Sequence, residues 1–179
     1  MVRLSAFVAL ALASFAAWSA TPPAWSIDYA KSRIDFVAEQ AGAKFPGRFT
    51  KFDADVHFDP AALADSFAVV RIATASVATE DGDRDSILRG EGWFESDKHD
   101  EAHFEARAFE VVPSGFRSTG TLTIGDKSAP VVLEFRLTAT GLVGSCDFDR
   151  LSLGLGLGDW ADETWIGHRV HVDVVVVKR

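Results

Sequence analysis

Apolar and polar residues alternate with a period of two along most of this chain. Such alternation turns one face of a β-strand toward a core and the other toward water. The alternating segments number about eight and are separated by short turns rich in Gly and Asp, which is typical of antiparallel β-proteins. The pattern therefore predicts an all-β chain that forms either a barrel or a sandwich.

The longest alternating stretch changes its parity once. Phe45, Gly47 and Phe49 share one face, whereas Phe52 and the apolar residues after it continue on the other parity. An extra residue in a long, curling strand produces such a slip, which is a β-bulge. We therefore expect a bulge near residues 50–51.

A run of alternating Leu and Gly occupies residues 153–158. It lacks the strand–turn–helix context of a phosphate-binding loop. Glycines inside a strand allow a sharp bend or a close approach to a ligand. We therefore expect a strand over residues 142–157 that bends near its end.

One segment breaks the strand pattern. The turn signal Asp81-Gly82 is followed by Asp83, which can cap a short helix over residues 84–89. The aromatic pair Trp93-Phe94 and an acidic loop come next. A helical insertion near residues 83–94 in an otherwise all-β chain suggests a lid over the mouth of a barrel.

The inward positions do not decide between the two architectures. An eight-stranded barrel can hold one small ligand, whereas a sandwich fills its interior with side chains. Large residues such as Phe36 and Phe135 occur beside small ones such as Ala38 and Gly120. That mixture is compatible with a cavity and with a packed core, so the alternation alone leaves both open.

The beginning of the chain has the pattern of an export signal. Arg3 supplies one positive charge, and residues 4–17 are apolar or small. This run is too short for a mature membrane-spanning helix. We expect residues 1–19 to be a signal peptide cleaved near 19/20, with an uncleaved membrane anchor as the alternative. Residues 20–179 would then form a single periplasmic or secreted domain, long enough for one sizeable core.

Charge and cysteine usage narrow the function classes. The net charge of −8 and the lack of a basic stripe argue against nucleic acid as a partner. Cys146 is the only cysteine, which excludes an intramolecular disulfide and a cysteine-based metal site. His99 and His103 have a spacing that suits metal binding on a helix. They lie where a loop enters a strand, however, so we predict no metal site.

Eight short motifs, taken in order along the chain, resemble the YceI-like family. They are Gly47-Arg48-Phe49, Phe58-Asp59-Pro60, residues 75–79 (ASVAT), Arg84-Asp85 with Leu88, Phe94 with Ala102-His103-Phe104, residues 120–124 (GTLTI), Ala129-Pro130-Val131, and Asp149-Arg150 ahead of Leu153-Gly154. Each motif is weak alone, but their order and spacing agree over essentially the whole chain after the signal peptide.

The resemblance implies an extended, eight-stranded, antiparallel lipocalin-like barrel with a helical insertion. Members of the family bind a long amphiphile in an apolar bore, such as a polyisoprenoid, an isoprenoid quinone or a fatty-acid-like chain. They are typically periplasmic or secreted, and dimers are common among them, so a homodimer is an open alternative. The fold has no assigned catalytic residues, and no cofactor is implied beyond a bound lipid or isoprenoid quinone.

This chain departs from the family pattern where a polar headgroup would bind. Many members carry a His at the position of Gln40 and another at that of Lys31, and a Gly at that of Glu80. An amide can both donate and accept a hydrogen bond. Gln40 is therefore a candidate headgroup contact, and a Gln bonded to water at a strand end is the alternative.

Strand parity and the resemblance together predict the ligand-binding residues. Trp93 and Phe94 are expected either to gate the bore or to anchor the lid. Arg84 is a candidate headgroup contact, with an ion pair or hydrogen bonds that pin the helix to the rim as the simpler reading. The residues expected to line the bore are Phe36, Ala38, Gln40, Phe49, Val70, Ile72, Phe104, Leu122, Leu133 and Phe135.

The sequence thus predicts a non-enzymatic, exported binding protein that sequesters or transports an isoprenoid or acyl-chain lipid. One alternative is a non-transporting accessory subunit of a membrane redox complex, for which the barrel would be solid. Another is a hydrolase that uses the acids of residues 97–101 or His99, although no nucleophile–base motif is recognisable.

Overall fold

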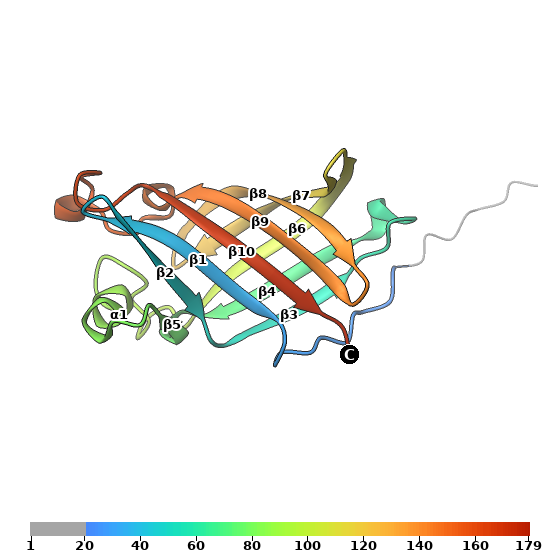
Figure 1. Cartoon of the computed structure of the whole chain (residues 1–179), viewed down its shortest axis with the longest axis horizontal. Coiled ribbons are helices and arrows are strands. Elements are labelled where there is room, and N and C mark those ends of the chain that lie inside the picture. The colour runs from blue at the N-terminus through green and yellow to red at the C-terminus, as the bar shows by residue number, and fades with distance from the viewer. Residues whose placement is uncertain (1–20) are drawn as a thin grey trace, which may run out of the picture.

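The computed structural model describes residues 21–179, which form one curled antiparallel sheet with a short helix at one end (Figure 1). The expected signal peptide lies outside the described residues. The strands are β1 (Arg33–Gln40), β2 (Ala43–Phe49), β3 (Phe52–His57), β4 (Phe67–Ala73), β5 (Val77–Ala78), β6 (Glu101–Val112), β7 (Gly115–Ile124), β8 (Lys127–Thr138), β9 (Gly141–Asp149) and β10 (Arg169–Val177), and the helix is α1 (Gly82–Arg89). The described residues also include four short 3-10 turns, at Leu63–Asp65 (η1), Thr74–Ser76 (η2), Arg150–Leu153 (η3) and Gly158–Trp160 (η4).

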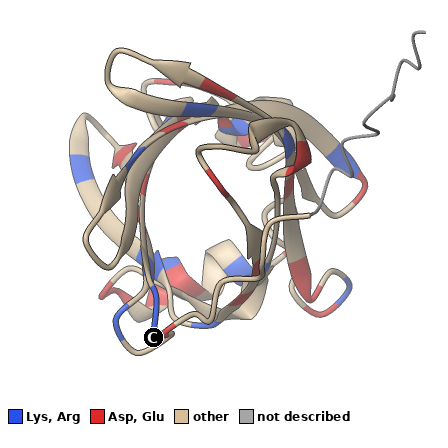
Figure 2. Ribbon diagram, turned by 90° about the vertical axis from the view of Figure 1, so that its right-hand side faces the viewer, with Lys and Arg blue, Asp and Glu red and all other residues tan. Residues whose placement is uncertain are grey.

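The ten strands make an eight-stranded barrel because two long strands are each broken in two. The sheet order is β3-β4-β6-β7-β8-β9-β10-β1-β2-β5. Only residues 50–51 separate β2 from β3, and only η2 separates β4 from β5. Phe49 pairs with Val77, and Phe52 pairs with Ile72, so the two bent strands run beside each other and join the ends of the sheet. The view along the barrel in Figure 2 shows the resulting ring. The predicted all-β barrel is confirmed.

The parity slip near residues 50–51 corresponds to the break between β2 and β3. Two backbone bonds bridge it, from Thr50 N to Ser76 O (3.1 Å) and from Ala73 N to Lys51 O (3.0 Å). The Ser76 hydroxyl accepts from the Lys51 amide at 3.1 Å and donates to the Ala73 carbonyl at 2.7 Å. Backbone groups that the bulge removes from the ladder are therefore satisfied locally.

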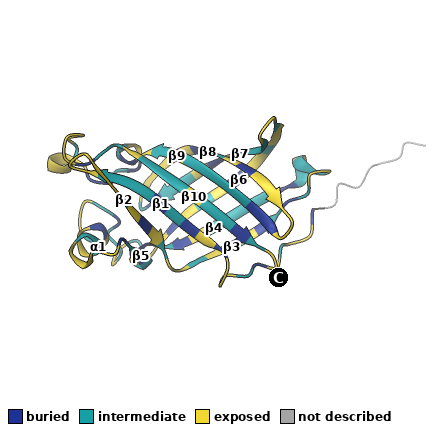
Figure 3. Cartoon of the chain, viewed as in Figure 1, coloured by how far each residue is buried: buried dark blue, intermediate teal, exposed yellow. Residues whose placement is uncertain are grey.

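Alternation along the strands places the core inside the ring, and Figure 3 shows buried, intermediate and exposed stretches interspersed along the strands. One core cluster lies toward α1 and includes Phe36, Val77 and Phe94. A second surrounds Phe58 and Phe135 at the opposite end. The outer face carries ion pairs across strands, which leaves the inner face to apolar groups.

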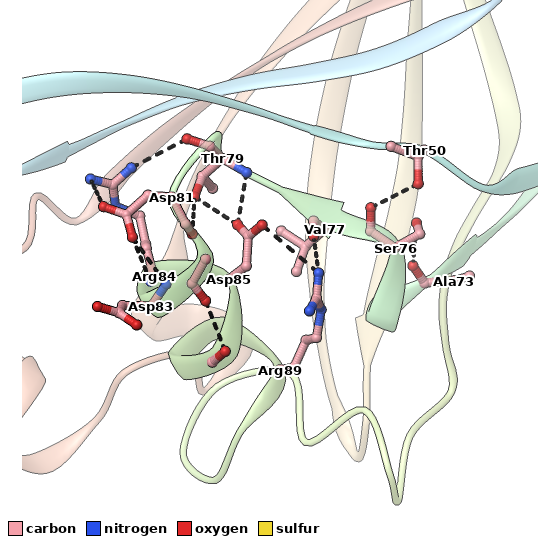
Figure 4. A network of polar contacts seen from close by, with 12 residues as sticks. Thr50, Ala73, Ser76, Val77, Thr79, Asp81, Asp83, Arg84, Asp85 and Arg89 are labelled. Carbon is pink, nitrogen blue, oxygen red and sulfur yellow. Dashed lines mark hydrogen bonds and ion pairs between the residues drawn. The ribbon is translucent and has the colours of Figure 1, made fainter.

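The predicted cap at Asp83 is wrong, because α1 begins at Gly82, two residues before the expected start at Arg84. Asp81 is the N-cap, and its carboxylate accepts from the amides of Asp83 (3.1 Å) and Arg84 (3.0 Å). Asp85 accepts from both the amide and the hydroxyl of Thr79 at 2.7 Å (Figure 4). These bonds fasten the helix to the end of β5.

The strand expected over residues 142–157 is wrong beyond Asp149, where β9 ends. The chain continues through η3 into a loop in which Gly154, Gly156 and Gly158 have φ angles of 74°, 64° and 63°. These left-handed conformations suit glycine and are incompatible with a strand. The alternating glycines therefore mark a folded loop at the end of the barrel that carries α1.

Candidate ligand-binding cavity

A cavity of about 390 Å³ runs inside the barrel. Its wall includes Leu88 of α1 at one end and Phe58, Leu142 and Val176 at the other, so it is elongated along the bore. A volume in this range is typical of sites for small organic ligands. Its wall is almost entirely apolar, so it suits a hydrocarbon chain.

Every predicted lining residue contributes to the cavity wall. Phe36 and Phe135 lie on strands far apart in sequence, and the closed sheet brings both to the same interior. This placement establishes that the predicted residues face the cavity. The predicted residues found in the wall are Phe36, Ala38, Gln40, Phe49, Val70, Ile72, Arg84, Trp93, Phe94, Phe104, Leu122, Leu133 and Phe135.

The prediction omitted several wall residues that the same signal would have found. Val172, Val174 and Val176 alternate along β10 toward the interior, and Val56 lies on the inward parity of β3. Strand parity alone identifies these positions. Arg150, by contrast, lies in a loop that no periodic signal describes.

The inner end of the bore is closed by aromatic rings that pack edge to face or tilted against one another. The Phe58 ring lies 5.4 Å from that of Phe109, 5.1 Å from that of Phe116 and 5.2 Å from that of Phe135, measured between centroids. Trp25 covers them, and its indole N–H donates to the Phe58 carbonyl at 3.1 Å. The end that carries α1 is therefore the candidate entrance to the cavity.

Arg84 and Gln40, predicted separately as polar contacts, meet at that open end. The Arg84 Nε donates to the Gln40 Oε1 at 3.2 Å, and its guanidinium lies 4.1 Å from the centre of the Phe45 ring. Asp81 lies 3.5 Å away as a counter-ion. The Arg84 guanidinium thus holds α1 against β1 through a hydrogen bond, which is the structural role given above as the alternative to headgroup binding. It also forms part of the cavity wall.

Trp93 and Phe94 close the cavity beneath α1. The Phe94 ring is buried and lies 5.6 Å from that of Phe49. Trp93 lies 6.3 Å from Trp160, between the cavity and the 150–160 loop. Phe94 therefore anchors the segment after α1 to the core.

The 150–167 loop is organised by a buried arginine. Arg150 is 2% exposed, and its guanidinium donates to five backbone carbonyls at 2.5 to 3.0 Å. The acceptors are the carbonyls of Leu155, Gly156, Trp160, Ile166 and Gly167. Burial lowers the pKa of Arg150, but the five bonds use every donor that the group possesses.

Two residues mark where the cavity opens. Ile87 of α1 and Trp160 of η4 both line the cavity, yet they are 46% and 41% exposed to solvent. Figure 1 shows α1 and the loop before β10 at the same end of the barrel. The opening therefore lies between the helix and the arginine-organised loop.

Little in the described residues points to catalysis. Burial raises the pKa of Cys146, on the inner face of β9, to about 11, which keeps the thiol protonated and unreactive at neutral pH. Among residues 21–179, no three His, Cys, Asp or Glu side chains gather so as to hold a metal ion. His103 is exposed on the outer face of β6 and lies 3.8 Å from Glu101.

Within the same residues, no helix has the length and apolar character needed to cross a membrane.

Known proteins are similar to this chain in sequence and in fold. The family model for the YceI-like domain matches residues 25–177. BcnA of Burkholderia cenocepacia superposes with a TM-score of 0.78 at 27% identity, over 86% of this chain and 100% of that one. The polyisoprenoid binding domain from Saccharophagus degradans superposes with a TM-score of 0.60 at 18% identity, over 87% of this chain and 98% of its own.

Curated relatives of similar sequence include UPF0312 proteins of Vibrio cholerae, which are 29% identical over 65% of this chain and 69% of their own length. A family model that covers nearly the whole described chain, together with the matching fold, decides membership. The chain belongs to the YceI-like family.

Proposed function

We propose that this protein is an exported, non-enzymatic binding protein that sequesters or transports a single-chain amphiphile, either an isoprenoid or an acyl-chain lipid. The observation that carries the proposal is the apolar bore of about 390 Å³, closed at one end by aromatic rings and flanked by polar groups at the other. The apolar chain would lie in the bore, and its headgroup would lie near Gln40 and Arg84.

The apolar wall supplies enough free energy for useful affinity. Burial of a methylene group contributes about 0.8 kcal/mol, so a dozen of them contribute about 10 kcal/mol before the costs of association. Lost translational and chain freedom offsets part of this gain. Affinity then comes from the tail, and the few polar groups at the mouth select the headgroup.

The volume of the cavity limits the length of the tail. If each water-sized group takes about 30 Å³, roughly a dozen chain atoms fill the bore. A long polyprenyl chain would extend out past Ile87 and Trp160. We therefore propose a tail of the size of a common fatty acid or a short isoprenoid.

The shared fold supports the barrel architecture and does not identify the ligand. The polyisoprenoid binding domain of Saccharophagus degradans has the same architecture at 18% identity, which bears on the shape of the barrel alone. A hollow interior favours a carrier over the accessory redox subunit, for which a solid barrel was expected. No described residue of the wall pairs a nucleophile with a base, so binding is proposed in preference to hydrolysis.

The direct test is to recover the ligand. Protein purified from its own host would be examined by native mass spectrometry and by organic extraction, and we expect an apolar single-chain lipid in amounts close to one per protein. Absence of any extractable lipid, together with no binding of added palmitate, would remove the main support for the proposal.

A pair of variants ties binding to the bore. Ala38→Phe places a ring inside the cavity, whereas Val37→Phe adds the same ring to the outer face of β1. We expect Ala38→Phe to weaken palmitate binding at least tenfold and Val37→Phe to leave it within about twofold of wild type. Equal effects of the two substitutions would place the ligand elsewhere.

A further inference from the structure

Two polar side chains of the cavity wall lack a hydrogen-bond partner among the described residues: Trp93, whose indole N–H lies near the mouth, and Ser118, whose hydroxyl lies deep in the bore. Ser118 lies on the inward face of β7 and is 2% exposed. Its register partners are Phe109 on β6 and Leu133 on β8, which also line the bore. No residue between 21 and 179 forms a hydrogen bond with its hydroxyl group.

Ser118 differs in this respect from the other Ser and Thr residues that are fully buried in the described chain, although the hydroxyl of the half-buried Ser96, outside the cavity, also lacks a partner. The hydroxyl groups of Ser32, Ser66, Thr74 and Thr79 each bond to a backbone carbonyl or a carboxylate at 2.6 to 3.0 Å. Leaving a buried hydroxyl without a partner costs about 1 to 3 kcal/mol, and Ala in its place would avoid that cost. A serine at this position is therefore suited to a partner that enters the cavity.

The hydroxyl lies far from the polar groups at the mouth. Phe116 precedes it by two residues on the same face of β7, and both Phe109 and Phe116 belong to the aromatic cluster that closes the inner end. Arg84 and Gln40 lie at the α1 end. The bore thus has a polar contact at each end with an apolar wall between them.

The inner contact suits a neutral partner. The surrounding rings offer no charge to balance an ion, and transfer of an unpaired carboxylate or ammonium into such a site is prohibitively costly. Cys146 also lines the cavity, and burial raises its pKa because the charged thiolate is poorly solvated there. A hydroxyl or carbonyl oxygen can bond to Ser118 without this cost.

We propose that Ser118 is a second polar subsite, which recognises a neutral oxygen on the buried end of the ligand. The inference rests on the proposed function and deepens it, because it assigns the ligand to a class: single-chain molecules that carry a hydroxyl or carbonyl group at the end that enters first. Such an oxygen reaches Ser118 either as a terminal hydroxyl on the tail or as an alcohol headgroup that enters head first.

Three ligands and three proteins test this subsite. Palmitate, 16-hydroxypalmitate and 1-hexadecanol would be titrated into wild type, Ser118→Ala and, as a control, Ser145→Ala, which removes a hydroxyl from the outer parity of β9. Wild type should bind a hydroxylated ligand more tightly, relative to palmitate, than Ser118→Ala does. Expressed as the Kd of palmitate divided by the Kd of the hydroxylated ligand, this preference should be about two- to tenfold larger in wild type than in Ser118→Ala. Ser145→Ala should match wild type.

Each outcome decides a separate point. A Ser118-dependent gain for 16-hydroxypalmitate alone indicates tail-first entry, and one for 1-hexadecanol alone indicates head-first entry. If Ser118→Ala changes the binding of all three ligands by the same factor, the subsite is refuted while the proposed function stands. If none of the three binds wild type, the proposed function fails and the subsite fails with it.

Discussion

Replacement of Arg150 tests whether one buried side chain holds the mouth of the cavity in shape. Its guanidinium bonds to five carbonyls of the 155–167 segment and contacts the Trp93 ring at 5.6 Å. Gly156 in the same loop donates to the Gly92 carbonyl at 2.7 Å, which links the loop to the segment after α1. Loss of the arginine would therefore loosen both sides of the opening.

The expected magnitude follows from the number of bonds. A hydrogen bond to a charged group contributes about 1.5 to 3 kcal/mol, while burial of the charge costs several kcal/mol. Arg150→Met leaves five carbonyls without their donor and recovers only the burial cost, so we expect a loss of about 3 to 4 kcal/mol in the free energy of unfolding. Arg150→Lys has three donors and should lose roughly half as much.

Urea unfolding and hydrogen exchange measure this loss. With a slope of about 2 kcal/mol per molar urea, the midpoint of Arg150→Met should fall by about 1.5 to 2 M. Amides of residues 150–167 should exchange faster than those of β6 to β8. Arg136→Met is the control, because Arg136 is exposed and should tolerate the change. Wild-type stability and unchanged loop protection in Arg150→Met would refute the reasoning.

Three further measurements address the loop, the bore and the outer face. Gly156→Ala should destabilise by about 1 to 3 kcal/mol in urea, because φ is 64° and the new Cβ would lie 2.7 Å from Arg150 Nη1; an unchanged midpoint would contradict this. Cys146 should react slowly with thiol reagents at pH 8 and faster as the pH rises toward its pKa of about 11. Bound palmitate should slow the reaction. Fast labelling at pH 8 would mean that water fills the bore. A hydrogen bond from Arg169 holds the pKa of Asp147 at about 2. This lowered pKa contributes stability above about pH 4 that is lost as pH falls toward 2, so Asp147→Asn should cost under about 1 kcal/mol at pH 7 and nothing near pH 2. A deficit that persists at pH 2 would argue against the ion pair.

The alternation of apolar and polar residues in the sequence was enough to predict most residues of the cavity wall. A β-strand has a period of two, so the side of each strand that holds Phe36, Val70 or Leu133 is fixed once the pattern is read. The slip near residues 50–51 likewise located the break between β2 and β3. These features are local, and local sequence specifies them.

The choice between a barrel and a sandwich was different, because it depends on which strands pair. The pairs Phe49–Val77 and Phe52–Ile72 that close the ring connect residues 28 and 20 positions apart. Only the resemblance to a known family indicated that choice in advance. Periodicity specifies faces, whereas closure depends on the packing of the whole sheet.

Tertiary structure alone decided the two ends of the bore. Arg84 and Gln40 are 44 residues apart, and no pattern in the sequence indicates that they share a hydrogen bond. The glycines at 154, 156 and 158 resembled a bending strand until the five bonds of Arg150 required a loop. Side-chain alternation is a short-range property of the chain, whereas the satisfaction of buried charges and hydroxyl groups depends on partners that only the folded protein brings together.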